Sequence, residues 1–101
     1  MLSGRAALER GKLWQAEYWI GGIRDQALAL ACVRHGLPAA YRRGVDRLDP
    51  AVTTRWEETL VRSLDATELR RALAVAATEL VHEVGEAKPT LAERLREALS
   101  L

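Results

Sequence analysis

Several residue types that define particular protein classes are scarce or missing in this chain of 101 residues. Cys32 is the single cysteine and there are two histidines, which excludes an internal disulfide and leaves no Cys/His cluster for zinc. No apolar run approaches the roughly 20 residues that cross a bilayer. Charged residues interrupt the N-terminal stretch, unlike a secretory signal peptide. We therefore expect a cytoplasmic protein with no metal site and no membrane partner.

An excess of either charge is missing too. The chain has 15 Lys and Arg against 14 Asp and Glu, a net charge of +1, so no nucleic-acid partner is expected. One local basic cluster does stand out, formed by Arg42, Arg43 and Arg47. Such a cluster is usually solvated surface, and contact with a phosphate or a phosphorylated ligand is the alternative that stays open.

The short motifs of common nucleotide-binding and catalytic sites are also absent, among them G-x-x-x-x-G-K-[ST], G-x-G-x-x-G, H-E-x-x-H and G-x-S-x-G. Cys32 and His35 are three residues apart and could touch on a helix, but a buried, unreactive thiol is the expected state of Cys32. His82 is expected to be at the surface or half-buried. The sequence thus contains no complete enzyme active site of its own.

What the chain does contain is a helix-forming composition, rich in Ala, Leu, Glu and Arg, with 49% hydrophobic residues. No alternating strand pattern is present. Because Phe is absent, the core is expected to consist of Leu, Ala and Val, with Trp14, Trp19 and Trp56 as its largest side chains. We expect a single all-α domain over residues 1–101.

The first predicted helix is the longest and covers residues 3–35. Apolar residues occupy most of its circumference, and Gly36 followed by Pro38 is a strong stop signal. Gly21 and Gly22 are its weak point, because each glycine costs about 1 kcal/mol relative to alanine in a helix. They predict either a break or the close approach of another helix.

Three shorter helices are predicted after this one, and short links favour antiparallel neighbours. The sequence therefore predicts an up-and-down four-helix bundle with the long first helix at its centre. The predicted segments are a connector over residues 36–49, a helix from Pro50 after the N-cap Asp49 with its apolar stripe at Val52, Trp56, Leu60 and Leu64, a helix from Asp65 to Gly85 with Glu68 completing a capping box, and a helix from Pro89.

Few polar residues interrupt the apolar first helix. Glu17 and Arg24 are seven residues apart and share a face, with Tyr18 and Asp25 close to it. A carboxylate on a mostly buried helix must be paired or must face a cleft. Two interpretations stay open: a structural network that joins Glu17 or Asp25 to an arginine, and a polar strip that lines a ligand cleft.

Five segments resemble the helical C-terminal domain of bacterial nucleotidyltransferase-like proteins, of the kanamycin and lincosamide nucleotidyltransferase group. The likeness covers most of residues 10–84. The segments are residues 12–20 (KLWQAEYWI), 24–32 (RDQALALAC), 34–39 (RHGLPA), 43–46 (RGVD) and 60–64 (LVRSL). The resemblance implies a helical bundle of the substrate-binding type, in which Glu17 is a possible general base toward the acceptor hydroxyl. The substrate-binding residues that it implies are Glu17, Tyr18, Arg24, Asp25 and Arg43.

In that family a separate α/β domain carries a Gly-Ser turn and two aspartates, which hold magnesium against a nucleoside triphosphate. This chain lacks that motif, since Asp46 and Asp49 lie in an arginine-rich segment with no preceding Gly-Ser. The resemblance therefore implies that the chain is catalytically incomplete. It would bind an aminoglycoside-like or other hydroxyl acceptor, and its partner would be a nucleotidyltransferase catalytic domain or subunit.

Two other classes of protein also form small helical domains. A toxin-type helical ribonuclease needs an arginine four to six residues before a histidine, and neither His35 nor His82 has one at that spacing. A helical dimerisation or protein-interaction module without a small ligand is the main alternative. In a homodimer of that kind, Trp14, Trp19 and Trp56 could anchor the interface.

Overall fold

The computed structural model describes residues 2–99 of the chain. That part is all-helical, as predicted, and contains no strand. It has five α-helices rather than four, so the finer prediction of a four-helix bundle is not confirmed. The elements are α1 (Leu2–Glu9), α2 (Leu13–Arg34), the 3-10 turns η1 (Ala40–Arg42) and η2 (Val45–Arg47), α3 (Pro50–Glu57), α4 (Ala66–Ala87) and α5 (Pro89–Ala98).

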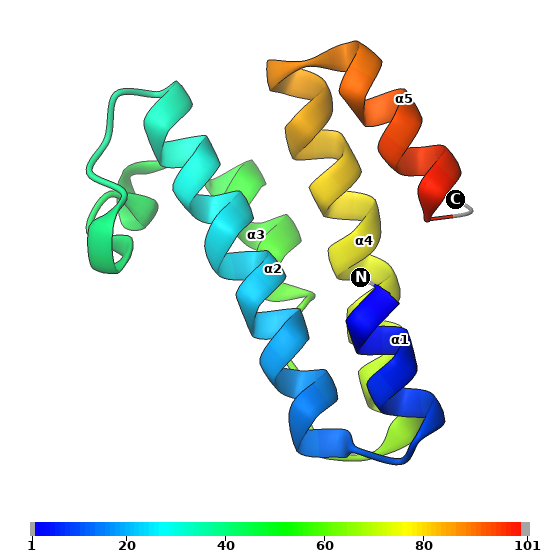
Figure 1. Cartoon of the computed structure of the whole chain (residues 1–101). Coiled ribbons are helices and arrows are strands. Elements are labelled where there is room, and N and C mark those ends of the chain that lie inside the picture. The colour runs from blue at the N-terminus through cyan, green and yellow to red at the C-terminus, as the bar shows by residue number, and fades with distance from the viewer. Residues whose placement is uncertain (1, 100–101) are drawn as a thin grey trace.

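Helices that follow one another in the chain run in opposite directions, so the two long helices α2 and α4 run the same way and pack against each other (Figure 1). Helix α4 also packs on α1, α3 and α5. The sequence predicts the first long helix alone at the centre of the bundle. Helix α4 shares that position, because it contacts all four of the other described α-helices. None of the helices within residues 2–99 is both long and apolar enough to cross a membrane.

The predicted helix over residues 3–35 is wrong at one point, since it is broken between α1 and α2. Gly11 has φ +70°, and its N–H donates to the carbonyl of Leu8 at 3.1 Å while that of Lys12 donates to Ala7 at 2.8 Å. This pair of bonds is the Schellman ending of a helix, in which glycine takes the left-handed position. The chain reverses there and α1 folds back beside α2 (Figure 1).

Gly21 and Gly22 neither break α2 nor admit another helix, so both parts of that prediction are wrong. Helix α2 continues through them to Arg34. A Cβ atom built at Gly22 would meet no atom within 4 Å, and one at Gly21 would meet only Glu17 and Arg24 of the same helix. The two glycines instead leave open space on the outer side of α2.

The core lies between α2 and α4, with contributions from α1 and α3. Trp56 is buried as predicted, whereas Trp14 is 76% exposed and Trp19 is 38% exposed, which corrects their placement in the core. Small side chains let the two long helices approach. The buried hydrophobic residues on them are Ala16, Ile20, Ala27, Leu28, Ala31 and Cys32 of α2 and Leu69, Ala72, Leu73, Ala76, Ala77 and Val81 of α4.

The starts of α3, α4 and α5 agree with prediction, and α3 and α4 have their predicted aspartate caps. The Asp49 carboxylate accepts from the Ala51 N–H at 2.9 Å, and the Asp65 carboxylate accepts from the Glu68 N–H at 3.0 Å. Two helix ends differ from prediction. Helix α3 stops at Glu57, which places Leu60 and Leu64 in the following loop, and α4 continues past Gly85 to Ala87.

Candidate functional site

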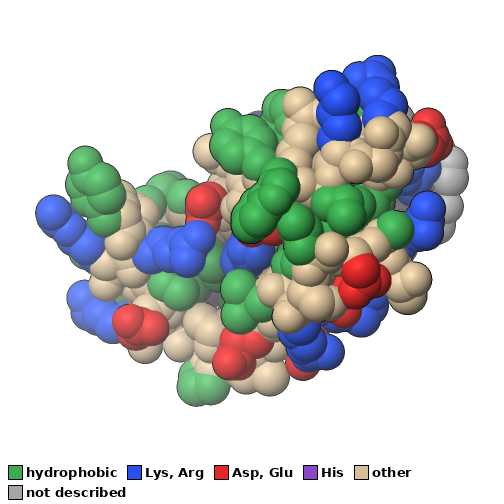
Figure 2. Space-filling view, turned by 90° about the horizontal axis from the view of Figure 1, so that it is seen from below, with side chains coloured by type: hydrophobic (Ala, Val, Ile, Leu, Met, Phe, Trp, Pro, Cys, Tyr) green, Lys and Arg blue, Asp and Glu red, His purple; other side chains and the backbone are tan. Residues whose placement is uncertain are grey.

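An open groove of about 760 Å³ lies along the outer side of α2, and we call it the α2 groove. Figure 2 shows this end of the molecule hollowed between the connecting segment, at the left, and the bundle. The lining residues are Glu17, Tyr18, Trp19, Gly21, Gly22, Ile23, Arg24, Asp25 and Gln26 of α2, with Arg42 of the connector and Leu80 of α4.

Four of the five residues that the resemblance implied therefore line one groove: Glu17, Tyr18, Arg24 and Asp25. Helical spacing alone brings these four to one side of α2. What the tertiary structure adds is Arg42 and Leu80, which close the groove from two other elements.

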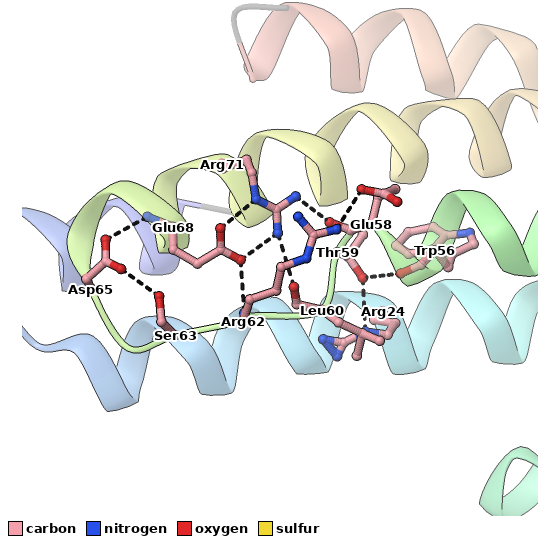
Figure 3. A network of polar contacts seen from close by, with 10 residues as sticks. All are labelled: Arg24, Trp56, Glu58, Thr59, Leu60, Arg62, Ser63, Asp65, Glu68 and Arg71. Atoms are coloured by element: carbon pink, nitrogen blue, oxygen red, sulfur yellow. Dashed lines mark hydrogen bonds and ion pairs between the residues drawn. The ribbon is translucent and has the colours of Figure 1, made fainter.

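Arg24 is the buried polar residue of the groove, with 7% of its surface exposed. Its Nε donates to Oγ1 of Thr59 at 3.0 Å, and that hydroxyl donates to the carbonyl of Trp56 at 2.6 Å (Figure 3). Burial, and after it the charge of Arg42, lowers the pKa of Arg24, while Asp25 and Glu17 oppose the shift. The guanidinium is thus held by a fully buried hydroxyl, which is itself hydrogen-bonded to the Trp56 carbonyl.

The loop that carries Thr59, residues 58–65, is tied to the first turns of α4. Arg71 donates to the carbonyls of Glu58 at 2.7 Å and Leu60 at 3.1 Å. The Glu68 carboxylate accepts from Arg71 and from the Arg62 N–H at 2.9 Å (Figure 3). These bonds lower the pKa of Glu68 from 4.5 to about 2, with the Arg71 bond as the largest cause.

The predicted capping box is therefore half correct. Asp65 caps α4, and the hydroxyl of Ser63 also donates to it at 2.6 Å. The hydrogen bonds of Glu68 run to Arg62 and Arg71 in place of the Asp65 N–H that a full capping box requires. The consequence for the site is a loop held at both ends, which keeps Thr59 under Arg24.

Asp25 forms an ion pair with Arg42, whose Nε donates to Oδ1 of Asp25 at 2.9 Å. Both side chains are about half exposed, at 52% and 55%. Of the two structural pairs that the sequence left open, the Asp25–arginine pair is present. No ion pair joins Glu17 to Arg24 within the described residues. Because Asp25 can still accept from a ligand with its second oxygen, the pair and the groove are compatible.

The connector reaches Asp25 through an unusual backbone. Tyr41 and Arg42 both have positive φ, 55° and 58°, a region that residues other than glycine seldom adopt. The Gly44 N–H donates to the Pro38 carbonyl at 2.8 Å, which closes the loop on itself. A Cβ at Gly44 would lie 2.6 Å from that carbonyl oxygen, so only glycine permits the crossing.

Glu17 is the groove carboxylate with no hydrogen bond or ion pair to any residue from 2 to 99. The position that a Cβ would take at Gly21 lies 4.0 Å from Oε1 of Glu17 and 3.8 Å from Nη1 of Arg24. A carboxylate and a guanidinium therefore flank one gap, which Gly21 keeps open. A carboxylate in that setting can accept a hydrogen bond from a ligand hydroxyl, as a general base must.

Arg43 does not line the α2 groove, and Arg42 occupies the place expected for it. The guanidinium carbon of Arg43 lies 5.6 Å from the ring centroid of Tyr41. Sequence reasoning also missed Leu80 and Thr59. The basic cluster indicated the correct segment of the chain. Whether Arg42 or Arg43 reaches the groove depends on the left-handed backbone of Tyr41 and Arg42, which the sequence does not indicate because no glycine or asparagine occupies those positions.

A second, smaller groove of about 320 Å³ lies on the other side of Arg24, between the connector and α3. It shares two residues with the α2 groove, Arg24 and Arg42. Its remaining lining is Leu28, Val45, Asp46, Thr53, Trp56, Glu57 and Leu60.

The other candidate residues lie away from these grooves. Cys32 is fully buried and burial raises the pKa of its thiol, so it is unreactive, as expected. His82 is exposed on α4, as predicted, with Nε2 3.7 Å from Oε1 of Glu86. Arg34 pairs with the buried carboxylate of Glu83 at 2.7 Å and joins the end of α2 to α4. No group of three or more His, Cys, Asp or Glu within residues 2–99 could hold a metal ion.

No protein family, no curated protein and no solved structure matches the chain.

Proposed function

We propose that the chain is the acceptor-binding helical domain of a nucleotidyltransferase-like protein. In this proposal α2 to α5 represent the four-helix bundle of the substrate-binding type and α1 is an addition to it. An aminoglycoside-like or other hydroxyl-bearing acceptor lies in the α2 groove. A separate catalytic domain or subunit supplies magnesium and the nucleoside triphosphate, which places the protein in the cytoplasm.

The observation that carries the proposal is the convergence of Glu17, Tyr18, Arg24 and Asp25 on one groove of about 760 Å³. This volume is within the range of roughly 300–1,000 Å³ typical of small-molecule sites. The lining combines aromatic rings with carboxylates and guanidinium groups, which is the mixture that a hydroxylated ligand needs for stacking and hydrogen bonds.

Each residue has a role in the proposal that follows from its position. Glu17, which has no partner among the described residues, accepts a hydrogen bond from the acceptor hydroxyl and can take its proton during transfer. Tyr18 and Trp19 offer ring faces and edges, with their centroids 5.4 Å apart. Arg24 and the Asp25–Arg42 pair orient the rest of the ligand. The phosphoryl chemistry belongs to the catalytic domain.

The test is a titration of the protein with kanamycin, lincomycin and glucose, followed by two-dimensional NMR of the backbone amides and the Trp19 indole. Binding in the groove shifts the signals of residues 17–26. Glu17→Gln weakens the binding, whereas Glu93→Gln, an exposed change of the same kind on α5, leaves it unaltered. Shifts outside the groove, or equal effects of the two substitutions, contradict the proposal.

A second candidate function is the protein-interaction module, which one observation favours. Trp14 is 76% exposed and Tyr18 is 68% exposed, one turn apart on the same side of α2. Large aromatic side chains are typical anchors of protein interfaces. Light scattering distinguishes the candidates: a concentration-dependent dimer that Trp14→Ser dissociates supports the module, and a strict monomer at high concentration contradicts a homodimer.

A further inference from the structure

Two arginine side chains lie at the junction of the two grooves. Arg24 and Arg42 are the two residues that line both the larger and the smaller groove. They come from different elements, α2 and the connector, and the folded chain brings them together. Like charges placed side by side destabilise each other, and Arg42 contributes to the lowered pKa of Arg24. An arrangement of this kind gains free energy when an anion occupies the space between the two cations.

Arg24 has unused hydrogen-bonding capacity on the groove side. Its Nε is occupied by Thr59, and its two terminal nitrogens bond to no other residue from 2 to 99. No buried side-chain nitrogen of the described residues lacks a partner, so these terminal nitrogens reach solvent in the groove. Figure 3 shows them turned away from Thr59 and Trp56. Donors fixed in this way lose little side-chain entropy when a ligand binds.

Arg42 is already engaged with an oxyanion, the carboxylate of Asp25. Its Nε and one terminal nitrogen contact the same oxygen, so the remaining terminal nitrogen is available to a ligand. Asp25 holds this arginine beside Arg24 and also competes with a bound anion for it. We therefore expect the site to bind an anion with moderate affinity.

We propose that Arg24 and Arg42 form an oxyanion site at the junction of the two grooves, which binds the phosphate or carboxylate group of a small hydroxylated molecule. Guanidinium groups suit either group, because their planar fork matches two oxygen atoms at once. The hydroxyl end of such a ligand extends along α2 toward Glu17, across the gap at Gly21. Because it names the charge of the same ligand, the inference rests on the proposed function. It favours an acidic acceptor over a polycationic aminoglycoside.

The experiment compares three ligands of one size: glucose, gluconate and glucose 6-phosphate. Their affinities are measured by NMR, with the side-chain Nε–H signals of Arg24 and Arg42 as local reporters. We expect gluconate and glucose 6-phosphate to shift both signals and to bind at least about tenfold more tightly than glucose, since charged hydrogen bonds contribute about 1.5–3 kcal/mol. The ratio between the two anions tells a carboxylate ligand from a phosphate ligand.

Arg42→Gln and Arg43→Gln form a matched pair, because both remove one exposed positive charge from the same segment and Arg43 lies outside both grooves. We expect Arg42→Gln to weaken the anionic ligands about fivefold, the effect of about 1 kcal/mol at a partly exposed site, and Arg43→Gln to change them less than about twofold. Asp25→Asn removes the competing carboxylate and strengthens them about threefold. None of these exposed changes touches the core.

Equal losses in the two arginine variants, or anionic ligands that bind no better than glucose, overturn the oxyanion site. The two proposals fail separately. If the anions shift Arg24 and Arg42 while no hydroxylated ligand affects Glu17, the oxyanion site stands and the acceptor function fails. If kanamycin binds beside Glu17 and the anions leave both arginines unmoved, the acceptor function stands and the oxyanion site fails.

Discussion

Replacing Gly21 or Gly22 by alanine should stabilise the protein, although glycine in mid-helix often signals tight packing. Alanine is favoured over glycine by about 1 kcal/mol in a helix interior. A Cβ at position 22 meets nothing within 4 Å, so Gly22→Ala gains the full amount. A Cβ at position 21 meets side-chain atoms at 3.8 and 4.0 Å, which is ordinary van der Waals contact, so Gly21→Ala gains nearly as much.

The assay is urea unfolding followed by far-UV circular dichroism, together with thermal melting. Each substitution should raise the urea midpoint at unchanged slope and the melting temperature by about 4–8 °C. Gly44→Ala is the opposite control, because its Cβ would overlap the backbone of Pro38 at 2.6 Å and must lower both. Destabilisation by Gly22→Ala would refute the reasoning, since it requires a neighbour that the open groove does not contain.

The two stabilising substitutions should differ in ligand binding. The alanine at position 21 adds a methyl group between the carboxylate of Glu17 and the guanidinium of Arg24. The alanine at position 22 contacts neither of them. We expect Gly21→Ala to weaken gluconate and kanamycin alike, and to weaken both more than Gly22→Ala does, at equal stability. Equal binding by the two variants would show that the ligand avoids this gap.

Three further predictions concern the contacts that support the groove. Thr59→Val removes the hydroxyl that accepts from Arg24 and should lower the free energy of unfolding by about 1–3 kcal/mol, measured by urea unfolding. The same variant should bind anions more weakly in NMR titrations. Arg34→Met leaves the buried carboxylate of Glu83 without its partner and should cost about 3 kcal/mol in the same assay. The pKa of Glu68 is about 2 in the folded protein and 4.5 ordinarily, so its stabilising effect is complete above pH 4.5 and is lost as the pH falls toward 2. Glu68→Gln should abolish that part of the acid dependence, and equal acid profiles for both proteins would contradict the assignment.

The starts of α3, α4 and α5 were predictable because their signals are local. Asp49 caps α3, with Pro50 as its first residue, and Asp65 caps α4 by accepting from the Glu68 N–H. Each signal acts within one helical turn and does not depend on tertiary contacts. The break at Gly11 was missed for the opposite reason: apolar residues continue on both sides of it, so the pattern concealed a C-cap glycine. Gly85 carried the same signal without ending α4, which continues to Ala87. This glycine lies at the contact with α5, where an added Cβ would be 3.6 Å from the Cβ of Ala92.

The candidate site was predictable as far as one helix determines it. Spacing along α2 groups Glu17, Tyr18, Arg24 and Asp25, and no tertiary information is needed for that. Arg42 was not predictable over Arg43, because its position depends on two left-handed residues and on the crossing at Gly44. The exposure of Trp14 was equally hidden, since its spacing fits an apolar stripe.

The two sides of helix α2 carry different kinds of residue and have different roles. The side that packs against α4 is made of small and aliphatic residues such as Ala16, Ile20 and Ala27, whereas the groove side carries Glu17 and Tyr18. The two sets interleave in the sequence, and they share Arg24, which is buried, and Ile23, which lines the groove and packs against the core. Binding specificity can therefore drift, or be redesigned, one residue at a time while the hydrophobic core stays untouched, which makes this helix a ready scaffold for selecting new small-molecule binders.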